Sequence, residues 1–188
     1  MRIFIESFFL VALSEMGDKT QLLAFSLAAR FKRPWPILGG IFLATLINHA
    51  LASAAGTWIS AEVNPRLMNL ALSLTFIGFG LWTLKPDREK THERTLHFGI
   101  FLTTLILFFL AEMGDKTQLA TLALGARFQS IVWVTAGTTL GMTLADGLAV
   151  VLGDRLSHRI PMSAVRWIAA LAFFAFGISS FVSFFRAA

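Results

Sequence analysis

Long apolar runs separated by short polar stretches make up almost the whole chain of 188 residues. A helix of about 20 apolar residues is long enough to cross a lipid bilayer. The pattern therefore predicts an all-α membrane protein with six transmembrane helices. Their expected bounds are Ile3–Phe31, Trp35–Ile59, Pro65–Leu84, His97–Phe128, Ile131–Leu152 and Ala164–Phe185.

The first of these runs is too long for a straight span. At about 1.5 Å per residue it exceeds 40 Å, whereas the hydrocarbon core is about 30 Å thick. It must tilt or break, and Gly17 is the natural place for a break. Because a broken helix at membrane depth is tolerated only beside protein or a water-filled cavity, a break here indicates a lined site. The fourth run has the same design, with Gly114 at the matching position.

The second half of the chain repeats the first at a constant offset of 97 residues. Examples are Arg30 with Arg127, Gly40 with Gly137, and Gly80 with Gly177; the polar position His49 corresponds to Asp146. The expected division is a first repeat at residues 1–84, a cytoplasmic linker at 85–96 and a second repeat at 97–188. Because each repeat has three spans, an odd number, the two repeats should enter the membrane from opposite sides.

Composition and charge exclude several classes of protein. With 56% hydrophobic and 14% charged residues, the chain is not a soluble domain. Its isoelectric point near 10.5 does not indicate nucleic-acid binding, because the basic residues lie in short loops between spans. There is no cysteine, which excludes a disulfide or a thiolate metal site.

The loop charges predict the topology. One side would carry ten basic residues: Arg30, Lys32, Arg33, Lys85, Arg88, Lys90, Arg94, Arg155, Arg159 and Arg166. The other side would carry four: Arg2, Arg66, Arg127 and Arg186. Since cytoplasmic loops hold the excess of Lys and Arg, we expect the first group inside the cell and both termini outside.

Eight residues occur twice inside these apolar runs: residues 15–22, EMGDKTQL, return unchanged as residues 112–119. We call these two segments the acidic boxes. Within each box a Glu and an Asp three residues apart share one helix face. Each charge at the bilayer centre costs about 2.5–3.5 kcal/mol on the insertion scale. Four such carboxylates indicate a cation or proton path; they are Glu15, Asp18, Glu112 and Asp115.

Other polar residues at membrane depth could assist these acids. Neutral ligand oxygens are available from Thr20, Thr117, Gln21, Gln118 and Asn48, and His49 and Asp146 are candidates for further ligands or a proton relay. Lys19 and Lys116 would balance part of the negative charge. They could instead neutralise the Glu four residues before them, or point away and hold the helices in register.

Four carboxylates and two lysines leave a formal charge of −2. This charge suits one divalent cation, or two protons when the cation is absent, which predicts an exchange mechanism. Oxygen ligands favour calcium, magnesium or manganese. His49, Met16 or Met113 would shift the preference toward manganese. The metal is expected as a transported substrate, with no permanently bound cofactor.

The paired E-x-G-D-[KR]-[TS] boxes, in two three-helix halves, resemble the family of Golgi manganese/calcium–proton exchangers and their bacterial relatives. The likeness is greatest to bacterial manganese exporters of the MneA type and covers essentially the whole chain. It implies cation/proton antiport, with Glu15, Asp18, Glu112 and Asp115 binding the ion. It also implies manganese efflux across a bacterial inner membrane, with calcium as another substrate.

Three alternatives remain open from the sequence. A transporter of a small organic cation, such as a basic amino acid, could use Lys19 or Lys116 to anchor a carboxylate. An intramembrane enzyme acting on a lipid pyrophosphate would need converging Arg, Ser or His donors, which the boxes lack. The boxes could also be polar contacts in a purely structural protein. The sequence leaves the oligomeric state open.

Overall fold

The computed structural model describes residues 1–85, 98–152 and 161–186, and these form eight α-helices and no strand. The helices are α1 (Arg2–Glu15), α2 (Lys19–Phe31), α3 (Pro34–Glu62), α4 (Pro65–Thr83), α5 (Ile100–Glu112), α6 (Lys116–Phe128), α7 (Ile131–Leu152) and α9 (Met162–Arg186). The expected linker at 85–96 lies outside the described residues except for Lys85, as do Arg88, Lys90, Arg94, Arg155 and Arg159.

The predicted breaks at Gly17 and Gly114 are confirmed. One long apolar run is divided into α1 and α2, and the other into α5 and α6, with the acidic box at the division. Gly17 has a φ of 80° and Gly114 a φ of 76°, a left-handed conformation that glycine adopts without steric cost. The chain can therefore turn sharply and resume a helix within three residues.

Local signals in the sequence set the remaining boundaries. Lys32 caps the C-terminus of α2 and Gln129 that of α6. Both residues are in the left-handed conformation, and their N–H groups donate to carbonyl oxygens four residues earlier. Pro34 starts α3, because a proline is tolerated in the first turn of a helix. The Asn64 side chain caps α4 by accepting from the Arg66 N–H at 2.9 Å.

Three described helices are long and apolar enough to cross a membrane: Pro34–Glu62, Ile131–Leu152 and Ser163–Arg186. α5 is apolar but shorter, as expected for half of a broken span. Large apolar side chains point outward from the bundle, including Trp58, Leu81 and Leu171. An exterior of this kind suits a lipid environment.

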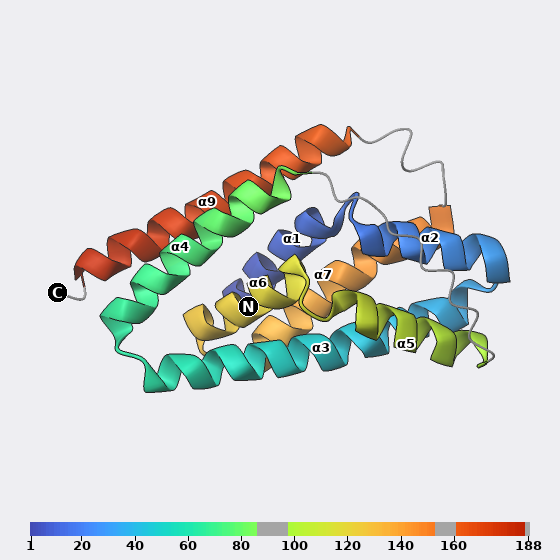
Figure 1. The fold of residues 1–188 in the computed structure, drawn as a ribbon, viewed down its shortest axis with the longest axis horizontal. Helices are drawn as coiled ribbons and strands as arrows, with labels where there is room; N and C mark the ends of the chain where they lie inside the picture. Colours follow the sequence, from blue (N-terminus) through green and yellow to red (C-terminus); the bar gives the residue numbers. More distant parts are fainter. Residues whose placement is uncertain (86–97, 153–160, 187–188) are drawn as a thin grey trace.

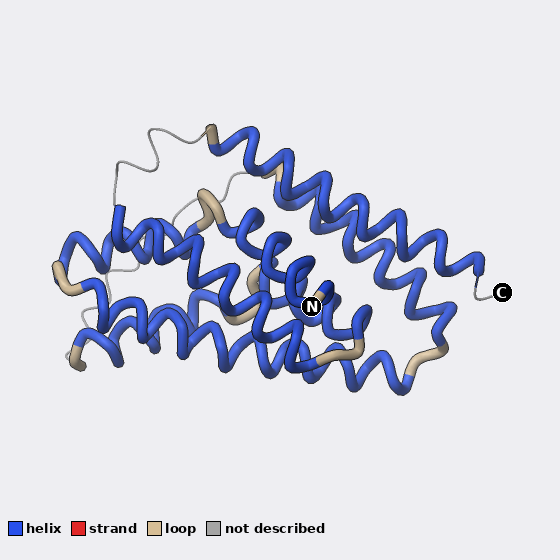
Figure 2. Tube along the Cα trace, turned by 180° about the vertical axis from the view of Figure 1, so that it is seen from behind, coloured by secondary structure: helices blue, strands red, loops and turns tan. Residues whose placement is uncertain are grey.

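α7 lies inside the bundle, and α3 runs along the side opposite α4 and α9 (Figure 1). α7 packs on α1 and α2, and α3 packs on α5 and α6, so each of these two helices supports the broken span of the opposite half. α3 and α7 also contact each other, through a 2.6 Å hydrogen bond between the Ser53 and Thr135 hydroxyls and through Thr45 and Met142. α4 and α9 run side by side along one edge (Figures 1 and 2).

Small residues allow the close approach of α3 to α6. Thr45, Asn48, Ala52 and Gly56 form a buried stripe on one face of α3. A Cβ on Gly56 would lie 2.9 Å from the Ala126 backbone nitrogen, closer than real Cβ contacts permit. The stripe therefore holds the second acidic box, at the start of α6, against α3.

Candidate cation site

Each acidic box is a helix end, a sharp turn and a helix start. Glu15 is the last residue of α1, and the Asp18 N–H donates to its carbonyl oxygen at 3.0 Å. The Gln21 side-chain oxygen accepts from the Gly17 N–H at 2.8 Å, which closes the turn. The second box repeats both bonds, at 3.1 Å between Asp115 and Glu112 and at 2.8 Å between Gly114 and Gln118.

Three of the four predicted ligand carboxylates come together. One oxygen from each of Glu15, Asp18 and Asp115 lies within 4.8 Å of the other two. All three side chains are buried, with residue exposures of 0, 1 and 6%. Carboxylate oxygens at this spacing form a site that a divalent cation could bridge. We call these three residues the carboxylate triad.

Glu112 is the exception. It is fully buried, but it is not part of the triad. Neither of its oxygens has a hydrogen-bond partner in the described part of the chain. The charges of Glu15, Asp115, Asp146 and Asp18 all act on it, so it belongs to the same electrostatic cluster.

The lysines pair between the boxes. Lys19 Nζ lies 2.6 Å from Asp115 Oδ1, and Lys116 Nζ lies 2.9 Å from Asp18 Oδ2. Pairing of each lysine with the Glu of its own box, the simplest reading of the i,i+4 spacing, is therefore not the arrangement in the structure. The crossed pairs tie the two boxes together and offset part of the triad's charge.

The threonines of both boxes donate hydrogen bonds to the same glutamate, Glu15. Thr20 donates to Glu15 Oε2 at 2.8 Å, and Thr117 of the other box donates to Glu15 Oε1. Their hydroxyls are thus oriented around the triad, with oxygen lone pairs close to any ion bound there. The sequence identified both residues as candidates, but it did not show that they would converge on Glu15.

The amide side chains have structural partners already. Gln21 donates to the Ala145 carbonyl oxygen of α7 at 3.0 Å, and Gln118 donates to Asn48 Oδ1 of α3 at 3.5 Å. Asn48 in turn donates to the Phe109 carbonyl oxygen at 3.2 Å. These three candidates fix the boxes against α3 and α7, so they position the triad in this structure.

His49 and Asp146 occupy equivalent places on α3 and α7. Both are fully buried, and no polar side-chain atom of either has a hydrogen-bond partner among the described residues. Asp146 lies close enough to Glu15 and Glu112 for their charges to interact. The structure thus associates Asp146 with the acidic cluster.

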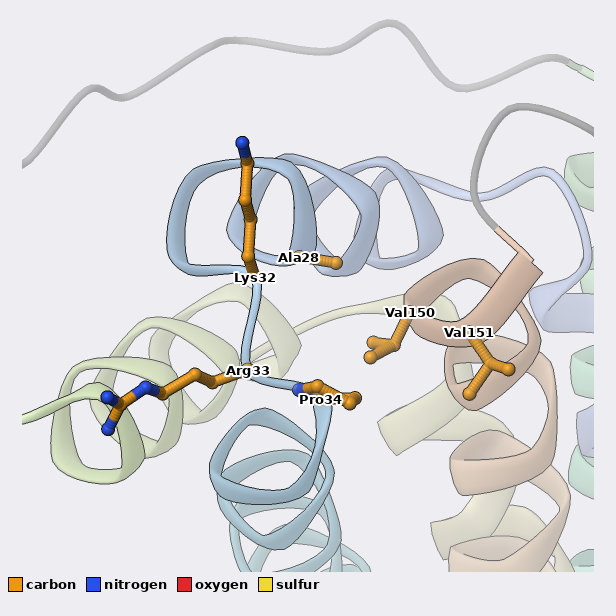
Figure 3. A pocket seen from close by; sticks show the side chains of 6 residues that line it. All are labelled: Ala28, Lys32, Arg33, Pro34, Val150 and Val151. Atoms are coloured by element: carbon orange, nitrogen blue, oxygen red, sulfur yellow. The ribbon is translucent and has the colours of Figure 1, made fainter.

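A separate cavity of about 210 Å³ lies where α2 turns into α3, beside the end of α7. It is lined by Ala28, Lys32, Arg33, Pro34, Val150 and Val151. Figure 3 shows that the Lys32 and Arg33 side chains extend away from the two valines. The basic groups therefore do not converge on one point, as an anion site would require.

Comparisons with known proteins agree with this geometry. The family described as "Divalent cation/proton antiporter GDT1" matches residues 3–91 and again residues 100–187. A Vibrio cholerae protein described as "Putative manganese exporter" is 43% identical, over 85% of this chain and 80% of its own.

Two further relatives carry the family's name. GDT1-like protein sll0615 of Synechocystis is 32% identical, over 91% of this chain and 92% of its own. GDT1-like protein 4 of Oryza sativa subsp. indica is 30% identical, over 95% of this chain and 72% of its own. No solved structure matches the chain. With both halves matched, and with a buried carboxylate triad suited to a cation, the chain belongs to the GDT1 family of divalent cation/proton antiporters.

Proposed function

We propose that this antiporter exports manganese in exchange for protons. The observation that carries the proposal is the carboxylate triad, which places three buried carboxylate oxygens within 4.8 Å of one another. Manganese is favoured by the name of the Vibrio cholerae relative and by the oxygen-rich donor set. Met16, in the turn of the first box, is half-buried and offers a softer donor nearby. Calcium, which also prefers oxygen ligands, is the second candidate substrate.

Charge explains why a cation and protons would compete for this site. The triad and two lysines carry a formal charge of −1, and Glu112 brings it to −2. A dication neutralises this charge, and so do two protons. Carboxylates must release protons to bind a metal, so binding of one expels the other. Exchange follows when the site opens to each side of the membrane in turn.

We further propose six transmembrane spans in two inverted repeats, at residues 1–84 and 97–188, joined by a linker at 85–96. The family model matches two stretches, 3–91 and 100–187, which supports the division. The crossed lysine–aspartate pairs are what two equivalent boxes facing each other would form. The loop charges support placing both termini outside a bacterial inner membrane.

The ligand set is a proposal in two parts. Glu15, Asp18 and Asp115 would bind the ion directly, with Thr20 and Thr117 as neutral donors. Glu112 would complete the site once an ion draws the boxes together, because its unpartnered oxygens are already buried beside the triad's charges. Asp146 is the candidate for a proton relay.

The test is proton movement in liposomes that contain purified protein and a pH-sensitive dye. Manganese, calcium and magnesium are added in turn to the unsubstituted chain, to Glu15→Gln and to Asp115→Asn. Glu62→Gln is the matched control, because Glu62 is an exposed acid at the end of α3. We expect manganese-driven proton movement that both site variants lose and the control retains.

Two other outcomes would contradict the proposal. Manganese entry without proton movement would leave a metal site but exclude antiport. No response to any divalent ion would favour export of a small organic cation.

A further inference from the structure

The α4–α9 pair forms one unit built from equivalent helices of the two halves. The rings of Phe76 and Phe173, which are 97 residues apart, stack with centroids 6.5 Å from each other. A Cβ on Gly177 would lie 2.8 Å from Ile77 Cγ1, so the two helices are in close contact. Such tight packing would keep the pair together if it moved relative to the rest of the bundle.

The α4–α9 pair packs against one side of the rest of the bundle. It packs on α1 and α6, and its aromatic side chains form one apolar cluster with residues of α6. Ala123 and Ala126 of α6 are buried there, at 1 and 5% exposure. Their equivalents on α2, Ser26 and Ala29, are exposed. Equivalent helix faces of the two halves therefore differ. The face on α6 is covered by the α4–α9 pair, and the face on α2 is exposed.

Arg127, at the end of α6, joins α6 to α9 through hydrogen bonds. Its guanidinium donates to the Phe176 carbonyl oxygen at 3.2 Å, to Ser179 Oγ at 2.9 Å and to Ser180 Oγ at 2.5 Å, all on α9. It also lies 4.9 Å from the centroid of the Phe176 ring. Charge-assisted hydrogen bonds of this kind are about twice as strong as neutral ones.

The equivalent residues on the other side are not joined. Arg30, the counterpart of Arg127, is exposed. Its guanidinium lies over the ring of the neighbouring Phe31, and it makes no side-chain hydrogen bond within the described part of the chain. Thr83 of α4 is the counterpart of Ser180. It is 3% exposed. Among the described residues its hydroxyl makes no hydrogen bond, and a buried hydroxyl that makes none costs free energy in this state.

We propose that Arg127 and Arg30 are alternating latches of the transport cycle. In the state described here Arg127 holds α9, and in the opposite state the α4–α9 pair leans on α2 while Arg30 bonds to Thr83. Only one latch is closed at a time, because the pair cannot lean on α6 and α2 together. The inference rests on the proposed inverted repeats, and it names the residues that hold each state.

The absence of cysteine from the chain allows distances to be measured between introduced spin labels. One label pair, Gln129→Cys with Val182→Cys, reports the covered side. The equivalent pair, Lys32→Cys with Lys85→Cys, reports the uncovered side. All four positions are exposed and are related by the offset of 97. The pairs are measured with and without Arg127→Gln, and in parallel with Arg30→Gln as the matched variant.

Arg127→Gln should shift the ratio of the two states at least tenfold, because it removes a guanidinium that donates three hydrogen bonds and the loss of one such bond is worth about that much. The 129–182 distance should lengthen as the 32–85 distance shortens. Arg30→Gln should leave the resting distances unchanged and slow manganese-driven proton movement about tenfold. Ser180→Ala removes one acceptor, and it should give a smaller shift in the same direction if Arg127→Gln does not fold.

Unchanged distances in Arg127→Gln would overturn the latch, and so would lengthening of 129–182 without shortening of 32–85. The proposed function is judged separately. If the unsubstituted protein moves no protons with any divalent ion but the distances shift as expected, the transport proposal fails and the latch remains. If the unsubstituted protein exchanges manganese for protons but the distances do not change in Arg127→Gln, the latch fails and the transport proposal remains.

Discussion

The two acidic boxes have the same eight residues and nearly the same local structure. Their glycines have φ values of 80° and 76°, and their turns close with N–H to carbonyl bonds of 3.0 and 3.1 Å. Each lysine pairs with the aspartate of the other box, at 2.6 and 2.9 Å. Short-range sequence is sufficient for the two turns, whereas the crossed pairs also need the boxes to pack against each other.

Beyond the turn the boxes differ. Glu15 accepts from both threonines, whereas neither oxygen of Glu112 has a hydrogen-bond partner among the described residues. The Lys116 side chain is buried at 9% exposure, whereas that of Lys19 is 35% exposed. The surroundings of the boxes also differ, because α7 carries a buried Asp146 where α3 carries a buried His49. The two identical segments therefore have different neighbours.

The largest expected consequence is a difference in stability between Asp18→Asn and Asp115→Asn. Each substitution relieves the same repulsion within the triad, but Asp18→Asn takes the ion pair from the buried Lys116. Loss of one partner from a buried pair costs about 3–5 kcal/mol, while a half-exposed lysine loses about 1 kcal/mol or less. Asp18→Asn should therefore be less stable by about 2–4 kcal/mol in denaturant unfolding in detergent. Equal stability would show that both lysines reach water in the absence of metal.

Ion binding should distinguish the two glutamates. Glu15→Gln removes a member of the triad and should weaken manganese binding about 100-fold, or about 2.7 kcal/mol. Glu112→Gln should weaken it less, by about tenfold, because Glu112 lies outside the triad and would reach the ion only after the boxes have moved. Calorimetric titration of manganese into each purified variant measures both values. Equal losses would mean that the two glutamates contribute equally to the bound ion and that their inequality belongs to the metal-free state alone.

A smaller effect is expected from the threonine that crosses between the boxes. Thr117→Val removes the donor to Glu15 Oε1 and keeps a side chain of similar shape. Loss of one hydrogen bond to a charged group costs about 1.5–3 kcal/mol, so binding of manganese should weaken about tenfold or more. Thr117→Ser retains the hydroxyl and is the matched control. If Thr117→Ser bound manganese as weakly as Thr117→Val, the lost affinity would not be due to the hydroxyl.

Much of this could be predicted from the sequence, because the signals were local or repeated. The expected span Ile131–Leu152 coincides with α7, and the expected breaks lie at Gly17 and Gly114. The pairing of Lys19 with Asp115 could not be predicted. Spacing along a helix shows which groups share a face, but it does not show which distant segment they meet.

The gathering of three carboxylates rather than four could not be predicted for the same reason. The offset of 97 treats Glu15 and Glu112 as equals, and only the packed structure separates them. From the sequence Arg127 is recognisable only as a basic loop residue, because its hydrogen-bond acceptors lie on α9, about 50 residues later in the chain.

The smallest effect concerns the backbone that both boxes share. At Gly114 an added Cβ would meet no atom within 4 Å, so Gly114→Ala tests the positive φ of 76° without a steric clash. An alanine held at this φ should destabilise the protein by about 1 kcal/mol. Gly78→Ala is the control, since Gly78 lies within α4 with the same open space around its Cβ position.

In a helix interior alanine is favoured over glycine by about 1 kcal/mol, so Gly78→Ala should stabilise the protein slightly. The two variants should therefore move the thermal unfolding midpoint in detergent in opposite directions. If Gly114→Ala were neutral, the turn of the second box could relax to a negative φ. The left-handed conformation would then not be required in the second box, although both glycines adopt it in this structure.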